Sequence, residues 1–350
     1  MKRKQLIYFL AAAILAGALG GIVFDRGLVP RLSTVKGFGW LQRYVNNAPI
    51  IITRREEIVL NEGANFIELA KQASSATVSL YQKSNLSFLG NGIILSSDGL
   101  IFTSKSAVGS FNEVLAVLND GSSFTGLVRA FDPKSNLAVL TIEAKTPSVL
   151  PFAEAHKMLS GQKVLTVGQL NKEFGRDFLS GFIVRSVSDN KGFFEVFSSE
   201  ILSESFVIEA GLNRGFLGSP LINLEGRLIG MVDTSGRIII SENIQTALSS
   251  YLASGKIARP RLGATYIQLS AMGARLRGLD RTGALIVGVE KNSAAHAAGI
   301  IANDLIYQID GQEVGSFEQI LNRHPIGEMK VKLLRGKQEL EFVINLEATK

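Results

Sequence analysis

Apolar residues in the middle of the chain form short runs in which apolar and polar positions alternate, a pattern typical of half-buried β-strands. Gly, Asn, Asp and Ser separate these runs. We expect strands at residues 77–81, 91–95, 114–118, 138–142, 163–167, 181–187, 193–197 and 228–233. One short helix, residues 66–73, precedes them, and strands at this density without alternating long helices predict a mostly β fold of barrels or sandwiches.

The last ninety residues mix helical and strand patterns. Residues 251–260, which contain Gly255 and Pro260, are expected to link this unit to the β region. A helix is expected at residues 294–298 with a left-handed stop at Gly299, followed by a strand at 305–309 and a tight turn at Asp310 and Gly311. Ser316 is expected to cap a second helix at 317–322. Residues 261–350 therefore read as an α+β domain.

The N-terminus carries an uncharged apolar run at residues 6–24. As a helix its 19 residues would be roughly 28 Å long, close to the thickness of a bilayer core. Because Lys2, Arg3 and Lys4 precede the run, we expect a cytoplasmic tail at 1–5, a transmembrane anchor at 6–24 and export of everything after it, to the periplasm or the cell exterior. The alternative is a cleaved signal peptide, since residues 16–21 are mostly small. Residues 25–61 then form a juxtamembrane linker.

Composition narrows the classes of partner. With 350 residues and 46% apolar content the chain can bury more than one core. Its 37 basic and 31 acidic residues leave a net charge of +6, but the only dense basic run is at residues 2–4, which argues against nucleic acid as a partner. The absence of cysteine excludes disulfides and thiol chemistry.

Three motifs in the β region resemble those of HtrA-type trypsin-like serine proteases. The family's nucleophile loop Asn-Pro-Gly-Asn-Ser-Gly-Gly-Pro-Leu corresponds to residues 213–221, Asn-Arg-Gly-Phe-Leu-Gly-Ser-Pro-Leu. The family's histidine motif Thr-Asn-Asn-His-Val-Val corresponds to residues 103–108, Thr-Ser-Lys-Ser-Ala-Val. Its aspartate motif Asp-Pro-x-x-Asp-Leu-Ala-Val-Leu corresponds to residues 132–140, Asp-Pro-Lys-Ser-Asn-Leu-Ala-Val-Leu. The resemblance implies a trypsin-like double β-barrel at residues 62–250.

The same alignment of motifs implies that the catalytic triad is replaced. Ser106 stands at the position of the general base, Asn136 at that of the orienting aspartate and Leu217 at that of the nucleophile. Without an imidazole and a nucleophile the proton transfer of a serine protease has no carrier. Gly215 and Leu217 would be the remnant of the oxyanion loop. We therefore expect no catalytic residues and a pseudoprotease.

The C-terminal domain resembles a PDZ domain. Residues 261–264, Arg-Leu-Gly-Ala, match its carboxylate-binding loop, and residues 288–311 carry the rest of the signature. The resemblance implies that Leu262, Gly263 and Ala264 bind the end of a peptide, and that Ile320 helps to line the pocket for its last side chain. Expected partners are exposed protein C-termini or unfolded peptides.

These expectations combine into one hypothesis about function. The chain is expected to be an exported, membrane-anchored, catalytically inactive peptide-binding protein that acts as a scaffold, sensor or regulator in protein quality control. No cofactor and no metal are expected. The resemblance also admits a homotrimer or assembly with active relatives. The alternative is an active serine endopeptidase of the HtrA family, because fold alone does not determine chemistry.

Overall fold

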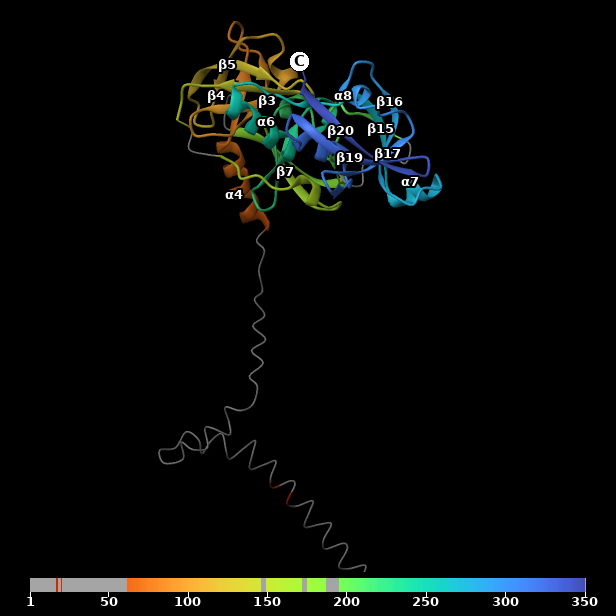
Figure 1. The fold of residues 1–350 in the computed structure, drawn as a ribbon. Coiled ribbons are helices and arrows are strands. Elements are labelled where there is room, and N and C mark those ends of the chain that lie inside the picture. Colours follow the sequence, from red (N-terminus) through yellow and green to blue (C-terminus); the bar gives the residue numbers. More distant parts are fainter. Residues whose placement is uncertain are drawn as a thin grey trace, which may run out of the picture. The chain divides into compact units, whose positions relative to one another are not determined.

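The structure is a computed structural model that describes residues 62–145, 149–171, 175–186 and 195–349, together with Gly17 and Gly20. The expected cytoplasmic tail, nearly all of the expected anchor at 6–24 and the linker at 25–61 lie outside these residues. Within the described ranges, no helix is both long enough and apolar enough to cross a membrane. Figure 1 shows the described part as a ribbon and labels some of its helices and strands.

The first β unit is a closed six-stranded antiparallel barrel in the order β1-β2-β3-β6-β5-β4. Buried and more exposed side chains alternate along its strand β4, where Val114 and Ala116 are fully buried, whereas Glu113 faces solvent. Its elements are β1 Thr77–Tyr81, β2 Phe88–Ile94, β3 Leu100–Ser104, α5 Lys105–Val108, β4 Glu113–Val117, β5 Ser123–Phe131 and β6 Leu137–Thr141. Helix α4, Glu62–Ser75, precedes the barrel, as the sequence predicted.

The second β unit is a six-stranded antiparallel sheet in the order β10-β8-β7-β11-β12-β13. Its strands are β7 Lys163–Asn171, β8 Gly175–Arg185, β10 Val207–Glu209, β11 Pro220–Asn223, β12 Leu228–Val232 and β13 Ile238–Ile240. Its described residues include the single-turn 3₁₀ helices η3 Ala155–Lys157, η4 Arg214–Phe216 and η5 Thr234–Gly236. A shared core that includes Phe102 of β3, Leu165 of β7 and Ile244 joins the two β units.

Helix α6, Ser241–Ser254, is an element that our sequence reading did not anticipate. Ile244, Ala247, Leu248 and Tyr251 recur at helical spacing and pack on the shared core, so the signal was present in the sequence. Gly255 ends the helix in the left-handed conformation. The first four residues of the expected linker at 251–260 are therefore helical.

The third unit is the expected α+β domain. Its strands are β14 Pro260–Arg261, β15 Ala264–Leu269, β16 Gly283–Val289, β17 Asp304–Ile309, β18 Gln312–Glu313, β19 Gly327–Arg335 and β20 Gln338–Ala348. Its helices are α7 Ala271–Leu276, α8 Ala294–Ala297 and α9 Phe317–Arg323. Gly299 has φ +79° after α8, and the Ser316 hydroxyl accepts from the Gln319 N–H at the start of α9, which confirms both local predictions.

One predicted strand is misassigned by our sequence reading. Residues 193–197 were expected to form a strand of the β-barrel region, but the described strand is β9, Val196–Ser198, and it pairs with β15 at the edge of the C-terminal sheet. Alternation along a strand reports that one face is buried and does not report which sheet supplies the partner. Through this pairing, a segment that the sequence places in the β-barrel region extends the sheet of the third unit.

Candidate functional site

The structure brings together the three residues that the motif comparison placed at the triad positions. Ser106 lies on α5 just after β3, Asn136 lies in the turn before β6, and Leu217 ends η4 before β11. The Asn136 Nδ2 group donates to Ser106 Oγ at 2.8 Å. Ser106 and Leu217 line one cavity of about 1100 Å³, and Ser106 and Asn136 line an adjoining one of about 620 Å³.

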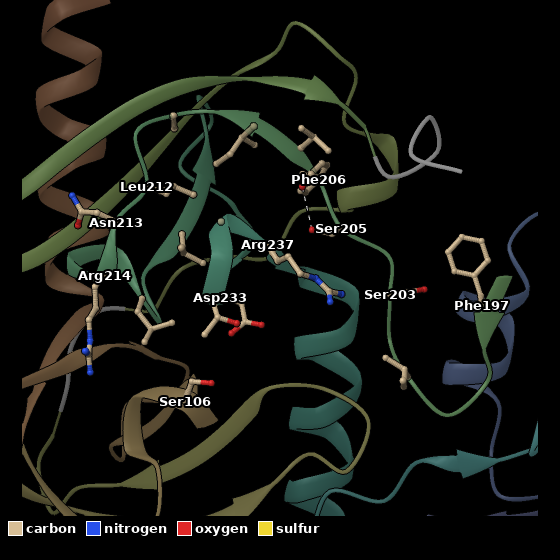
Figure 2. A pocket seen from close by; sticks show the side chains of 18 of the residues that line it. Ser106, Phe197, Ser203, Ser205, Phe206, Leu212, Asn213, Arg214, Asp233 and Arg237 are labelled. Carbon is tan, nitrogen blue, oxygen red and sulfur yellow. Dashed lines mark hydrogen bonds between the residues drawn. The ribbon is translucent and has the colours of Figure 1, made fainter. Parts of the chain in front are cut away.

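Asp233, which the motif comparison missed, holds the polar side of this site. It directly follows β12, and its Oδ1 accepts from Asn136 Nδ2 at 2.5 Å and from Ser104 Oγ at 3.1 Å. Figure 2 shows Ser106, Asp233 and Arg237 around the cavity. The sequence signal that could have pointed to Asp233 is a carboxylate placed directly after a buried strand. The amide of Asn136 donates and cannot relay a proton between Asp233 and a base.

Two backbone N–H groups of the nucleophile loop have acceptors within the loop itself. The Gly215 N–H donates to Asn213 Oδ1 at 2.7 Å, and the Leu217 N–H donates to the Arg214 carbonyl at 3.3 Å. An oxyanion hole requires both donors to point at the reacting oxygen. In this conformation both groups are engaged by η4 and its cap.

Asn91 of β2 holds the loop at residues 213–221 through hydrogen bonds. Its Nδ2 donates to the Gly215 carbonyl at 2.8 Å and to Ser219 Oγ at 2.9 Å. Gly218 has φ +79°, and a Cβ there would lie 2.0 Å from the Asn91 carbonyl oxygen, so only glycine fits. Ser219 is fully buried and faces Asn91 rather than the cavity.

The three histidines of the chain all lie outside the lining of the cavity. His156 Nδ1 lies 2.7 Å from Glu242 Oε1, and His324 Nε2 lies 2.7 Å from Asp310 Oδ2. His296 is on α8 of the C-terminal domain. Among the described residues there is also no group of three or more His, Asp or Glu side chains arranged to hold a metal ion.

The expected peptide-binding residues are also brought together. Leu262 and Gly263 precede β15, Ala264 begins it, and Ile320 on α9 packs against the core that contains Leu262 and Ala264. The N–H groups of Leu262 and Gly263 converge on one carboxylate oxygen, Glu200 Oε1, at 3.1 and 2.8 Å. The ligand of this loop in the structure is thus a side chain of the same polypeptide.

Glu200 is held in its ionised form. Burial alone would raise the pKa of the Glu200 carboxyl, but the Lys134 charge and the N–H groups of Gly263 and Leu262 outweigh burial and hold that pKa below its ordinary value. Lys134 Nζ lies 3.4 Å from Glu200 Oε2. Burial in turn lowers the pKa of Lys134, against the opposing attraction of Glu200.

Both β units and the C-terminal domain have counterparts in known proteins. Residues 90–231 match the trypsin-like peptidase domain model, and residues 285–322 match the PDZ domain model. The chain is 28% identical over 308 residues to a protein of Rickettsia prowazekii described as a probable periplasmic serine endoprotease, DegP-like, covering 83% of this chain and 56% of that protein. It is 26% identical over 286 residues to the serine endoprotease DegS of Haemophilus influenzae, covering 78% of this chain and 81% of that protein.

Other DegP-like relatives are matched over a similar share: the chain covers 58% of the Marinomonas protein and 48% of the Chlamydia muridarum protein. The chain therefore spans about half the length of these relatives. A solved structure described as the HtrA-type protease AlgW with tripeptide matches with a TM-score of 0.64 at 22% identity, covering 82% of this chain and 97% of that one. The structural likeness shows a shared fold. Together with the motif order, the comparisons show that the chain contains an HtrA/DegP-type trypsin-like protease domain followed by a PDZ domain.

Proposed function

We propose that this protein binds peptides and does not cleave them. The observation that carries the proposal is the identity of the residues at the three triad positions, Ser106, Asn136 and Leu217. Leu217 offers no nucleophilic atom, and among the described residues no histidine lines the cavity. The engaged N–H groups of Gly215 and Leu217 support the same conclusion, since they leave no preformed site for an oxyanion.

The cavity gives such a protein a peptide cleft. Apolar side chains of Leu212, Leu217 and Val232 share its wall with Asp233 and Arg214. A groove of this mixed character suits an extended segment of unfolded protein, with apolar pockets for side chains and polar groups for the backbone. The PDZ domain adds a second site, for C-termini.

We further propose that the chain is held at a membrane through residues 6–24, with the β units and the PDZ domain exported. The basic flank at Lys2, Arg3 and Lys4 supports this orientation. The periplasmic description of the DegP-like relatives is consistent with export. In this arrangement the protein acts as a tethered scaffold, sensor or regulator in protein quality control.

A serine-directed fluorophosphonate probe tests the inactive state directly. We expect no covalent labelling of the full chain, and hydrolysis of unfolded casein at no more than about one thousandth of the rate of an active relative, because loss of a triad costs factors of 10⁴ to 10⁶. The Haemophilus influenzae DegS protein serves as the active control. Stoichiometric labelling of this chain at any serine would overturn the proposal and restore the alternative of an active endopeptidase.

A further inference from the structure

The peptide-binding edge of the PDZ domain is occupied by a strand of the protease domain. β9 runs antiparallel to β15, with Ser198 opposite Thr265 and Phe197 opposite Tyr266. The pairing continues beyond the strand: the Ser199 N–H donates to the Ala264 carbonyl at 2.9 Å. Strand addition at this edge, in this direction, is how a PDZ domain takes a C-terminal peptide.

The end of this strand carries a substitute for a terminal carboxylate. Glu200 Oε1 accepts the N–H groups of Leu262 and Gly263, and Ser199 Oγ accepts the Ala264 N–H at 2.9 Å. Three successive loop donors, which a free carboxyl terminus would engage, are therefore satisfied from inside the chain. Lys134 holds the remaining oxygen of Glu200 from the first barrel.

The register assigns positions within this internal ligand. Because the Ser199 N–H pairs with Ala264 next to the carboxylate-binding loop, Ser199 corresponds to the last residue of a bound peptide. Phe197 then corresponds to the residue two before the end. Its side chain packs against the PDZ core, as that of Ile320 also does, and its ring centre lies 5.8 Å from that of Tyr266. An aromatic side chain at this position is what the groove accommodates.

We propose that residues 196–200 are a built-in ligand of the PDZ domain, and that an external C-terminus with an aromatic residue in the third position from its end binds by displacing them. This inference rests on the proposed peptide-binding function of the PDZ domain. A groove filled for most of the time binds a competitor with an apparent affinity reduced by the fraction of open molecules. Weakening the internal ligand should therefore strengthen external binding.

The test measures binding of a fluorescein-labelled peptide, Glu-Val-Phe-Ser-Ser with a free carboxyl terminus, to the full chain in detergent. Its sequence is that of residues 195–199. We expect Glu200→Gln to bind it about tenfold more tightly than the wild type, since charge-assisted hydrogen bonds exceed neutral ones by about 1 to 2 kcal/mol. Phe197→Ala should act in the same direction. Glu225→Gln, the same change at an exposed carboxylate, should bind like the wild type.

The outcomes separate this inference from the function on which it rests. Equal, measurable affinity in the wild type, Glu200→Gln and Phe197→Ala would overturn the built-in ligand and leave PDZ recognition standing. Equal binding of an amidated peptide, or no binding by any variant, would overturn PDZ recognition of C-termini and the inference with it. Hydrogen exchange adds an independent check: the Ser199 amide should exchange slowly in the peptide-free chain and faster once peptide is added, and fast exchange without peptide would contradict occupancy.

Discussion

A single buried arginine connects three parts of the molecule. Arg259 is fully buried, and its Nη2 donates to Asp132 Oδ2 at 2.5 Å and to the Asn243 carbonyl at 2.9 Å. Its Nη1 donates to Asn322 Oδ1 at 2.8 Å. The turn before β6, helix α6 and helix α9 thus share one guanidinium. The fork of donors on arginine is needed here, because a lysine ammonium cannot reach all three acceptors in one plane.

Truncation of the Arg259 side chain should destabilise the folded protein strongly. We expect Arg259→Ala to lower the free energy of unfolding by about 3 to 5 kcal/mol, because it leaves the Asp132 carboxylate buried without a counter-ion. Urea denaturation of the full chain measures the loss. Arg227→Ala removes an arginine that is half exposed and paired with an exposed glutamate, and should cost less than about 1 kcal/mol. Similar losses in the two variants would contradict this account of Arg259.

At the scale of elements, helix α9 is attached to the protease domain by a buried carboxylate. Glu318 in its first turn accepts the N–H groups of Ser203 and Glu204, each at 3.0 Å. Glu204 in return accepts from Ser316 and Gln319 at the same helix end. Burial, reinforced by the neighbouring Glu204 charge, raises the pKa of Glu318 above its ordinary value in spite of these donors.

The sign of the pH dependence follows from this shift. A raised pKa in the folded state means that the folded protein binds the Glu318 proton more tightly than the unfolded chain, whose value is near 4.5. The contribution of Glu318 is therefore most favourable below that value and declines as the pH rises through the raised pKa. We expect the stability difference between wild type and Glu318→Gln to shift against the wild type as the pH rises above about 4.5, as followed by thermal unfolding. A difference that is flat with pH would refute the shift.

Local sequence signals predicted much of this architecture. The strand β1 and the caps at Gly299 and Ser316 follow from alternation, glycine and a hydroxyl at the right place. The meeting of Ser106 with Asn136 and Leu217 at one site could be predicted, because motif spacing preserves which loops meet. Contacts between distant segments could not: nothing near Glu200 indicates Lys134 or Gly263 as its partners, and Asp233 can be recognised as a site residue only once the fold places Asn136 beside it.

For the molecule as a whole, the proposed orientation across the membrane can be tested by cysteine labelling, because the chain has no native cysteine. A single Ser84→Cys change places a thiol on an exposed loop after β1. We expect a membrane-impermeant maleimide to label it in intact cells, because the proposed topology exports the β units. The matched variant Gln5→Cys, in the expected cytoplasmic tail, should be labelled only after lysis.

The reverse labelling pattern would invert the proposed topology. Recovery of a soluble chain that lacks the first 20 to 25 residues, about the length of a signal peptide, would instead favour cleavage over a retained anchor.

The position of Arg259 at the junction of the domains limits how the two halves can be studied apart. It lies in the short connection between α6 and β14, yet its side chain is seated among residues of both halves. Deleting the chain from Gly255 onward would take a positive charge out of the first barrel and uncover one side of α6. A shortened protein prepared in this way would report damage to the barrel as well as lost recognition of C-termini. Point substitutions in the groove are the sounder way to silence the PDZ domain.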